Sequence, residues 1–357
     1  MRCLALANGL RAAGGDTYFI CRDLPGHLGV EILKQGYPVH LLPAPSDENG
    51  GTGWQEDATR SQAIADELPS LDWLVVDHYE LDLRWEAAMR ASAARIMVID
   101  DLANRRHDCD VLLDQNYYEG MEARYDGLVP VDCRKLLGPG FALLRPEFRQ
   151  ERNRLRIRDG LIRRILVCFG GADPHNLTAK ALEAISRVVH TEIPVDIVVG
   201  AANPHNEMLA AVCRHQPCVK LHIQANNMAE LTAAADLGIG AGGATTWERC
   251  LLGLPALTVV VADNQERTTH DLSKYGAIRY LGRAESVSVN DIADAIEWAK
   301  SFPAEMKAMS LRAMQLMDAF MQHDQPPAVL ALLQETRAGR LVERYDTKST
   351  EAGKNVR

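Results

Sequence analysis

The sequence lacks the usual signs of a metal site, a membrane span or a nucleic-acid partner. Its eight cysteines form no CxxC pair and several fall inside apolar runs, so we expect free thiols in a reducing compartment and no bound metal. No run approaches the roughly 20 apolar residues that span a bilayer, and the N-terminus lacks a signal-peptide layout. The formal net charge of −9 gives a nucleic acid no electrostatic support. These absences predict a cytoplasmic protein.

The composition that is present is typical of a globular α/β protein. Hydrophobic residues make up 47% of the 357 residues, enough for about two domains with separate cores. Short apolar strands alternate with helices, and this alternation restarts after a densely charged stretch that we interpret as solvated. We therefore expect a βα domain over residues 1–148, a linker over 149–162, a second βα domain over 163–335 and a disordered polar tail over 336–357.

Polar side chains follow two strands expected in the first domain. The strand over residues 73–77 runs into His78 and Tyr79, and the next strand runs into Asp100 and Asp101. Ligands of α/β sheets bind beyond the carboxyl ends of the strands, so His78 and Tyr79 are candidate catalytic residues. The alternative is that they cap and pack the following helix. The two aspartates could act in acid/base catalysis, bind a metal or have a structural role. We favour the structural role, because no further set of metal ligands accompanies them.

Glycine-rich turns follow two strands expected in the second domain. Gly170 and Gly171 end one strand, and residues 240–243 end another and lead directly into a helix. Glycines let the backbone approach a ligand, and free N–H groups at a helix start favour an anion. One such turn is weak evidence, because glycine turns also occur where nothing binds. Two of them, with a polar turn at Asn264 and Gln265 after a third strand, indicate a nucleotide diphosphate site.

The pattern of these turns excludes two common nucleotide motifs. No GK[ST] follows either glycine turn, so neither is a P-loop, and no GxGxxG supports a dinucleotide. Glu248 lies about one helical turn beyond the second glycine turn. A carboxylate at that position could accept hydrogen bonds from a sugar hydroxyl.

The chain resembles the UDP-sugar hydrolases of the pseudaminic acid pathway, which belong to the GT-B superfamily. The resemblance runs from Met1 to about residue 335. It is carried by Val76-Asp77-His78-Tyr79, Ile99-Asp100-Asp101, Phe141-Ala142-Leu143-Leu144-Arg145-Pro146-Glu147-Phe148, Phe169-Gly170-Gly171-Ala172-Asp173, Gly242-Gly243-Ala244-Thr245-Thr246-Trp247-Glu248 and Asp263-Asn264-Gln265. It implies two Rossmann-like βα domains that face a cleft, and hydrolysis of UDP-2,4-diacetamido-2,4,6-trideoxy-β-L-altropyranose to UDP and the free sugar.

The resemblance also implies roles for particular residues. Those expected to hold the nucleotide are Gly170, Gly171, Asp173, Gly242, Gly243, Ala244, Thr245, Glu248 and Gln265, with Glu248 on the ribose. His78, Tyr79 and Asn264 are expected to hold the sugar or the attacking water. No cofactor and no metal are needed, because backbone dipoles can neutralise the diphosphate. The expected partner is a UDP-sugar, and the expected state is a monomer.

One feature of the family is missing. Its members carry a first strand and a Gly-x-Gly-His loop directly before the helix that starts here at Met1, and that histidine is the expected general base. No residue here takes its place, and His27 belongs to a later turn. We therefore expect an N-terminally shortened form whose first domain lacks its first strand. A glycosyltransferase of the same fold, or a catalytically impaired protein that only binds UDP-sugar, are the alternatives.

Overall fold

The computed structural model describes residues 1–24, 26–44, 53–189, 193–320, 329, 330 and 333. The chain forms two compact units. Unit 1 contains Met1–Gln115, Glu122–Leu137 and the described residues near the C-terminal end, and unit 2 contains Asn116–Met121 and Gly138–Gln322. The tail expected over residues 336–357 lies outside the described residues. No helix in the described part of the chain is long and apolar enough to cross a membrane.

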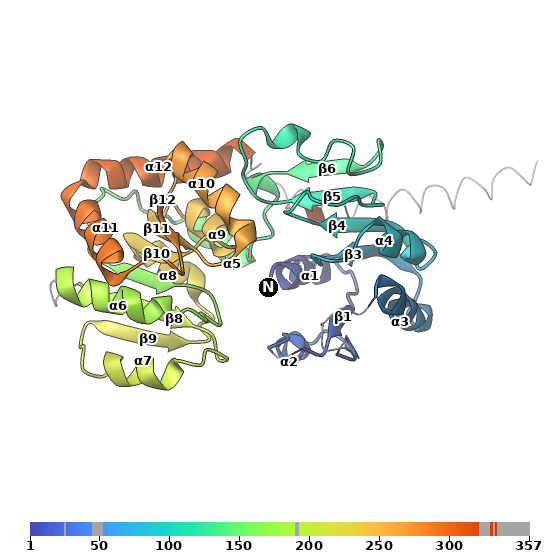
Figure 1. The fold of residues 1–357 in the computed structure, drawn as a ribbon, viewed down its shortest axis with the longest axis horizontal. Coiled ribbons are helices and arrows are strands. Elements are labelled where there is room, and N and C mark those ends of the chain that lie inside the picture. Colours follow the sequence, from blue (N-terminus) through green and yellow to red (C-terminus); the bar gives the residue numbers. More distant parts are fainter. Residues whose placement is uncertain (25, 45–52, 190–192, 321–328, 331–332, 334–357) are drawn as a thin grey trace, which may run out of the picture. The chain divides into compact units, whose positions relative to one another are not determined.

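Unit 2 is built on one six-stranded sheet in which all neighbouring strands are parallel, with the order β12-β11-β10-β7-β8-β9 (Figure 1). The strands are β7 (Ile165–Cys168), β8 (Val195–Val199), β9 (Val219–Ile223), β10 (Leu237–Ala241), β11 (Ala256–Val260) and β12 (Arg279–Arg283). Runs such as Ile165-Leu166-Val167 contain apolar side chains at consecutive positions, because helices cover both faces of the sheet.

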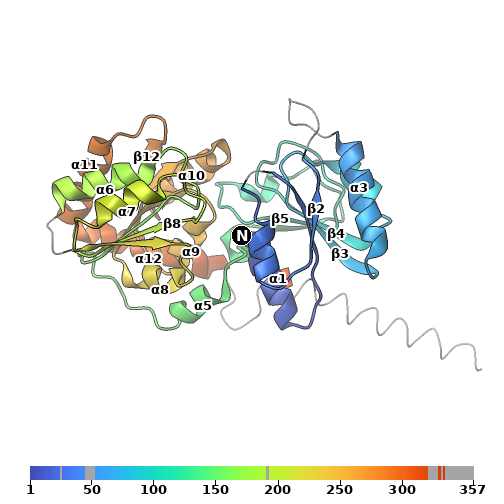
Figure 2. The same ribbon diagram turned by 90° about the horizontal axis from the view of Figure 1, so that it is seen from below.

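The helices of unit 2 bury two separate cores against the two faces (Figure 2). They are α5 (Pro146–Arg152), α6 (Leu177–Val188), α7 (Asn206–Cys213), α8 (Met228–Ala234), α9 (Thr245–Leu251), α10 (Glu266–Tyr275), α11 (Val289–Ser301) and α12 (Pro303–Phe320). Ile165 and Val167 point to the core with α6, α7 and α11, whereas Leu166 points to the core with α5, α8, α9, α10 and most of α12. Methionines of α12, such as Met306 and Met317, are buried.

Unit 1 contains parallel strands too, but they form two sheets. The strands are β1 (Phe19–Arg22), β2 (Val39–Leu42), β3 (Leu71–Val76), β4 (Ala93–Ile99), β5 (Val111–Asp114) and β6 (Arg134–Leu137). The helices are α1 (Arg2–Ala12), α2 (Gly29–Lys34), α3 (Trp54–Glu67) and α4 (Leu83–Met89). One small core joins α1 and α2 to β1 and β2, and another joins α3 and α4 to the remaining strands.

The strands of unit 1 are divided between two separate sheets in the described structure. The first sheet contains β1 and β2, and the second has the order β3-β4-β5-β6, so β1 and β3 are both edge strands in the described structure. Except for the buried Val76, their apolar side chains are only partly buried, whereas all four residues of β5 are buried. Edge strands leave N–H and C=O groups without ladder partners.

The stretch that the sequence indicated as a solvated linker, residues 149–162, is instead packed within unit 2. Helix α5 places Phe148 in a core, and Arg158 is only 2% exposed. The Arg158 guanidinium donates to the backbone carbonyls of Thr232, Ala233 and Ala235 at 2.8–3.2 Å. Arg158 is thus buried and paired with carbonyl groups, whereas Arg154, Arg156 and Asp159 of the same stretch are exposed.

Boundaries between the compact units also differ from those expected. Unit 2 begins at Gly138 rather than at residue 163. Val329 and Leu333 are buried, and Leu330 packs on α1, where a Cβ at Gly9 would lie 2.6 Å from a Leu330 methyl carbon. The C-terminal end of the described chain thus belongs to unit 1, although the sequence placed it in the second domain.

Candidate functional site

The strand order of unit 2 creates a switch point between β7 and β10. From β7 the chain moves through β8 to β9 on one side, and then crosses to β10, β11 and β12 on the other. Ligands of open parallel sheets bind at the carboxyl ends of the two strands that flank such a point. The turn at Gly170-Gly171 follows β7, and the second glycine turn leaves β10 at its last residues, Gly240 and Ala241, and continues through Gly242 and Gly243. The structure therefore brings both glycine turns to the same edge of one sheet.

The glycines of the second turn are required by close backbone packing. A Cβ at Gly240 would lie 2.2 Å from the carbonyl oxygen of Cys168 on β7, and a Cβ at Gly242 would lie 2.3 Å from Thr269 Oγ1 on α10. Real Cβ atoms do not approach other atoms so closely. A Cβ at Gly243, by contrast, would lie 3.4 Å from Gln265 Nε2. The turn is thus held tightly at Gly240 and Gly242, and it is open at Gly243.

Three consecutive backbone N–H groups of this turn are available to a ligand. Those of Gly243, Ala244 and Thr245 have no hydrogen-bond partner in the described part of the chain, whereas the N–H of Gly242 donates to Val259 at 3.2 Å. Successive unpaired amides form an anion-binding concavity. Helix α9 has only seven residues, so its dipole adds less than these local amides.

The Gln265 side chain adds a fourth donor. Its Oε1 accepts the N–H of Val261 at 3.1 Å, which fixes the orientation of the amide and turns Nε2 toward the glycine turn. Gln265 ends the 3₁₀ helix Asp263–Gln265 that follows β11, and Asn264 lies within the same short helix. The structure therefore brings together Gly242, Gly243 and Gln265, which are far apart in the sequence.

Glu248 lies at the edge of a small hollow beside this turn. The hollow is lined by Leu166, Cys168, Met228, Thr232, Ile239, Thr245, Glu248 and Arg249. The Glu248 Oε1 accepts from Arg145 Nε at 3.0 Å. Burial raises the pKa of Glu248, while the nearby Arg145 charge lowers it. Arg145 and the buried Arg249, whose Nη2 donates to Ala241 at 2.8 Å, place positive charge at this edge of an acidic protein.

Asp173 has a different environment from the other residues expected at the nucleotide. It is 3% exposed, and its two carboxylate oxygens accept the N–H groups of Leu177 at 2.9 Å and Thr178 at 2.8 Å. It thereby caps α6, although Asn176 is the residue that directly precedes this helix. The Asn176 side chain makes no capping hydrogen bond, and its backbone is left-handed with φ of 50°. Gly170, with φ of 96°, gives the chain the conformation that leads into this cap.

In unit 1, the loop after β3 presents His78 and Tyr79 at the carboxyl edge of the sheet. Both residues are exposed. The Tyr79 hydroxyl donates to Asp101 Oδ2 at 3.4 Å, and burial together with the Asp101 charge raises the pKa of Tyr79 to about 12. Tyr79 is therefore a neutral hydrogen-bonding group over the physiological range. The adjacent Asp77 forms a bidentate ion pair with Arg2 at 2.6 and 3.0 Å.

Asp100 and Asp101 are held by the protein itself. Asp100 Oδ2 accepts from the N–H of Ala103 at 2.8 Å and from the Tyr125 hydroxyl at 3.0 Å, and Oδ1 forms an ion pair with Arg105. The structural interpretation of this pair therefore agrees with the contacts. Within the described residues, no group of three or more His, Cys, Asp or Glu side chains could hold a metal ion. His27 lies elsewhere, within 3.3 Å of Asp23.

Sequence reasoning missed Arg145 and Arg249 as residues that shape these sites, because the Glu248 partner of Arg145 lies in another element. The ion pair of Arg105 with Asp100 agrees with the structural role expected for the two aspartates. The available signal was that Arg145 falls inside one of the motifs that carried the resemblance. Arg249 directly follows Glu248 in a helix that is otherwise apolar, and a charge at such a position must find buried partners.

Comparisons with known proteins agree with this geometry. Residues 165–322 match the model of the glycosyltransferase family 28 C-terminal domain. The chain is 29% identical over 264 residues to the UDP-2,4-diacetamido-2,4,6-trideoxy-beta-L-altropyranose hydrolase of Campylobacter jejuni. The aligned region covers 73% of this chain and 87% of that protein. It is 33% identical over 151 residues to the spore coat polysaccharide biosynthesis protein SpsG of Bacillus subtilis, covering 42% of this chain and 44% of that protein.

Solved structures give the fold. The MurG structure from Acinetobacter baumannii aligns with a TM-score of 0.59 at 15% identity, covering 94% of this chain and 95% of that one. UGT89C1 of Arabidopsis thaliana aligns with a TM-score of 0.63 at 12% identity, covering 95% of each chain. The protein therefore has a GT-B-like α/β fold with two parallel-sheet, Rossmann-like parts, and its residues 165–322 are similar to the glycosyltransferase family 28 C-terminal domain.

Proposed function

We propose that this protein hydrolyses a UDP-linked diacetamido-trideoxy-hexose to UDP and the free sugar, a reaction of pseudaminic acid biosynthesis. The observation that carries the proposal is the row of unpaired amides at Gly243, Ala244 and Thr245, beside Gln265 Nε2 at the switch point of the sheet. Support for the substrate comes from the hydrolase of Campylobacter jejuni, to which the chain is similar over most of its length.

The chemistry follows from where negative charge develops. Water attacks the anomeric carbon while the bond between that carbon and the β-phosphate oxygen breaks, so the leaving UDP gains negative charge. Amides that already point at the diphosphate stabilise this charge in the transition state without reorganisation. In the proposal, Gly242, Gly243, Ala244 and Thr245 hold the diphosphate.

The remaining nucleotide contacts come from neighbouring turns of unit 2. Gln265 donates to the diphosphate through Nε2, and Glu248 accepts hydrogen bonds from the ribose hydroxyls through its carboxylate. Gly170 and Gly171 allow the backbone after β7 to lie close to the nucleotide. Asp173 contributes indirectly, because its carboxylate is committed to the cap of α6.

Residues of unit 1, together with Asn264, supply contacts to the sugar or to water. His78 and Tyr79 extend from the loop after β3, and Tyr79 keeps its proton at neutral pH. A general base must lie within hydrogen-bond reach of the attacking water. In the resembling family this base is the histidine of the Gly-x-Gly-His loop. No residue of this sequence matches that histidine, so the rate of hydrolysis is the quantity that tests the proposal most directly.

The full chain incubated with the UDP-sugar and no acceptor tests the proposal. We expect UDP and free sugar to appear in equal amounts, measured by ³¹P NMR and by chromatography of the sugar. Binding of UDP in titration calorimetry with no release of sugar would instead indicate a protein that binds UDP-sugar without turning it over. Absence of UDP binding would reject the proposal itself.

A glycosyltransferase is the second candidate, favoured by the match to the glycosyltransferase family 28 C-terminal domain. It would use the same UDP contacts and pass the sugar to an acceptor hydroxyl instead of to water. Release of UDP that depends strictly on an added acceptor would favour this candidate over the hydrolase.

A further inference from the structure

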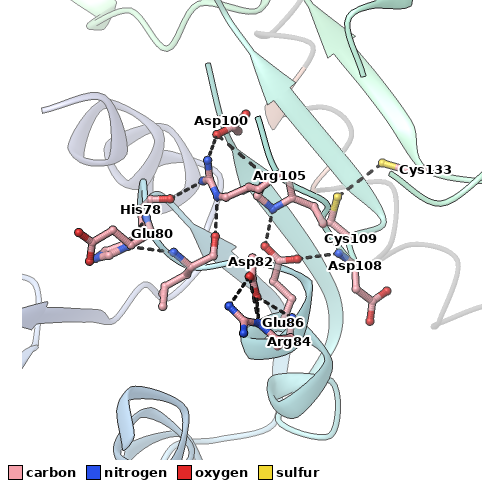
Figure 3. A network of polar contacts seen from close by, with 12 residues as sticks. His78, Glu80, Asp82, Arg84, Glu86, Asp100, Arg105, Asp108, Cys109 and Cys133 are labelled. Atoms are coloured by element: carbon pink, nitrogen blue, oxygen red, sulfur yellow. Dashed lines mark hydrogen bonds and ion pairs between the residues drawn. The ribbon is translucent and has the colours of Figure 1, made fainter. Parts of the chain in front are cut away.

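The loop after β3 holds its histidine in one tautomer (Figure 3). His78 Nδ1 accepts the backbone N–H of Glu80 at 3.1 Å and that of Leu81 at 3.3 Å. A backbone N–H can only donate, so Nδ1 must present a lone pair. A neutral imidazole carries a single ring proton, which then lies on Nε2. The loop geometry thus makes the outer nitrogen of His78 a donor.

We propose that His78 donates a hydrogen bond from Nε2–H to a hydroxyl or carbonyl oxygen of the sugar and does not act as the base that activates water. A base needs an unprotonated nitrogen that faces the water. The one unprotonated nitrogen of His78 is taken by the two loop amides. The identity of the ligand oxygen depends on the proposed function, whereas the tautomer depends on the loop alone.

The charged groups around His78 keep the ring neutral. Burial lowers the pKa of His78 below its usual value, and the charges of Arg22 and Arg105 act in the same direction against Asp57 and Glu80. Arg22 is itself ion-paired with Asp57, so these two charges largely offset each other. Protonation of the ring would also break both hydrogen bonds to Nδ1, because that nitrogen would then carry a proton.

Arg105 is the positioning residue of this loop. Its Nη2 donates to the backbone oxygen of His78 at 2.7 Å, as Figure 3 shows. Its Nε donates to the backbone oxygen of Leu81 at 2.8 Å. Its Nη1 forms an ion pair with the buried Asp100 at 2.7 Å. The planar guanidinium therefore holds both ends of the segment that orients the imidazole, which the point charge of a lysine cannot do.

Two substitutions separate a donor from a base. His78→Asn keeps an acceptor for the loop amides, because an Asn side chain forms the same kind of turn, but it removes the outer donor. His78→Gln places an amide N–H near the position of Nε2 and gives up the inner acceptor. We expect His78→Asn to lower kcat/KM by about tenfold, and His78→Gln to lower it less. If His78 were instead the general base, both variants would lose that base and kcat/KM would fall equally in both.

A matched pair tests the positioning role. We expect Arg105→Lys to release the loop, so that both ring tautomers of His78 become populated and the amides of Glu80 and Leu81 exchange faster. Arg84→Lys is the control, because Arg84 pairs with Asp82 just beyond the loop and contacts neither His78 nor Leu81. Unchanged His78 spectra in Arg105→Lys would remove Arg105 from the proposal.

Two-bond ¹H–¹⁵N NMR spectra of the full-length protein decide the central point, since they assign the ring proton to Nδ1 or Nε2 without substrate. We expect the Nε2–H tautomer at neutral pH. A proton on Nδ1, or a His78→Gln variant no more active than His78→Asn, would overturn the proposal. If the protein fails to hydrolyse the UDP-sugar, the proposed function fails while the tautomer spectrum still stands as an independent result.

Discussion

Arg145 Nε lies 3.0 Å from Glu248 Oε1, so the carboxylate expected to hold the ribose is paired with a residue from the start of α5. The pair is partly buried, with side-chain exposures of 23% for Arg145 and 12% for Glu248. Burial alone would favour the protonated acid, and the arginine counteracts it. Protonation would turn one carboxyl oxygen into a donor and remove the negative charge, so an ionised Glu248 is the stronger acceptor for two ribose hydroxyl groups.

Replacement of Arg145 should therefore make nucleotide binding depend on pH. We expect Arg145→Met to raise the pKa of Glu248 further and to weaken UDP binding about tenfold near neutral pH. The affinity should return only at a higher pH, at which Glu248 ionises. Titration calorimetry from pH 5 to 9 measures this. Arg154→Met, at an exposed position in the same segment, is the control and should leave the affinity unchanged. A loss of affinity that is the same at every pH would contradict the electrostatic role.

Glu248 should also leave a signature in stability. Its pKa is raised in the folded protein, so the stability contributed by its protonated form is present at low pH and is lost as pH rises through that pKa. The neutral amide of Glu248→Gln does not ionise. We therefore expect the free energy of unfolding of Glu248→Gln, relative to that of the wild type, to increase as pH rises and then to level off. Urea unfolding at several pH values measures the difference, and a constant difference would show that Glu248 does not titrate as described.

The two ends of the glycine turn should respond differently to an added methyl group. Gly240→Ala would push a Cβ to 2.2 Å from the Cys168 carbonyl oxygen, so we expect a loss of about 3 kcal/mol or more in the free energy of unfolding. Gly243→Ala meets Gln265 Nε2 at 3.4 Å and should fold almost normally. Its methyl group would crowd the diphosphate, and we expect UDP affinity to fall about tenfold. Thermal unfolding and calorimetry compare the two variants. Normal UDP binding by a folded Gly243→Ala protein would place the diphosphate elsewhere.

Arg158 should be among the more sensitive positions of unit 2. Burial lowers its pKa to about 10, and its guanidinium satisfies backbone carbonyls at the C-terminal end of α8, including those of Thr232 and Ala235. Arg158→Met would leave these oxygens buried without donors, so we expect a loss of about 3–5 kcal/mol in urea unfolding. The exposed Arg154→Met again serves as the control. Equal stability of the two variants would mean that water replaces the guanidinium at no cost.

The divided sheet of unit 1 should be visible in hydrogen exchange. β1 and β3 each pair with one neighbour, whereas β5 pairs with both β4 and β6. Edge strands open locally more often, so we expect amides of β1 to exchange at least about tenfold faster than those of β5. Mass spectrometry of peptic peptides measures the difference. Equally slow exchange in β1, β3 and β5 would show that their free edges are protected in solution.

The strands were predictable because their signal is local. Runs such as Val195–Val199 and Ala256–Val260 are mostly apolar, as is typical of a strand covered on both faces, and the structure places fully buried strands at these residues. Both glycine turns were also predictable as turns. Their meeting at one edge followed once the strand order placed β7 beside β10, and this order is set by packing between distant segments.

The arginines were not predictable, because the same residue type serves opposite purposes. Arg154 is exposed and Arg158 is buried, although they lie four residues apart in the same charged stretch. The difference arises from carbonyls that α8 brings close in space and that no local pattern reveals. Asp173 was ambiguous for a related reason. A carboxylate before a helix can cap that helix or contact a ligand, and only the distances to Leu177 and Thr178 distinguish the two.

The cap made by Asp173 has a consequence for how an anion meets unit 2. On the β7 side of the switch point, the first amides of α6 are neutralised by an internal carboxylate that also repels phosphate. On the β10 side, the amides of Gly243, Ala244 and Thr245 stay unpaired in the described chain. The two glycine turns therefore differ in their attraction for an anion. A bound pyrophosphate has one preferred orientation along the sheet edge instead of two equivalent ones.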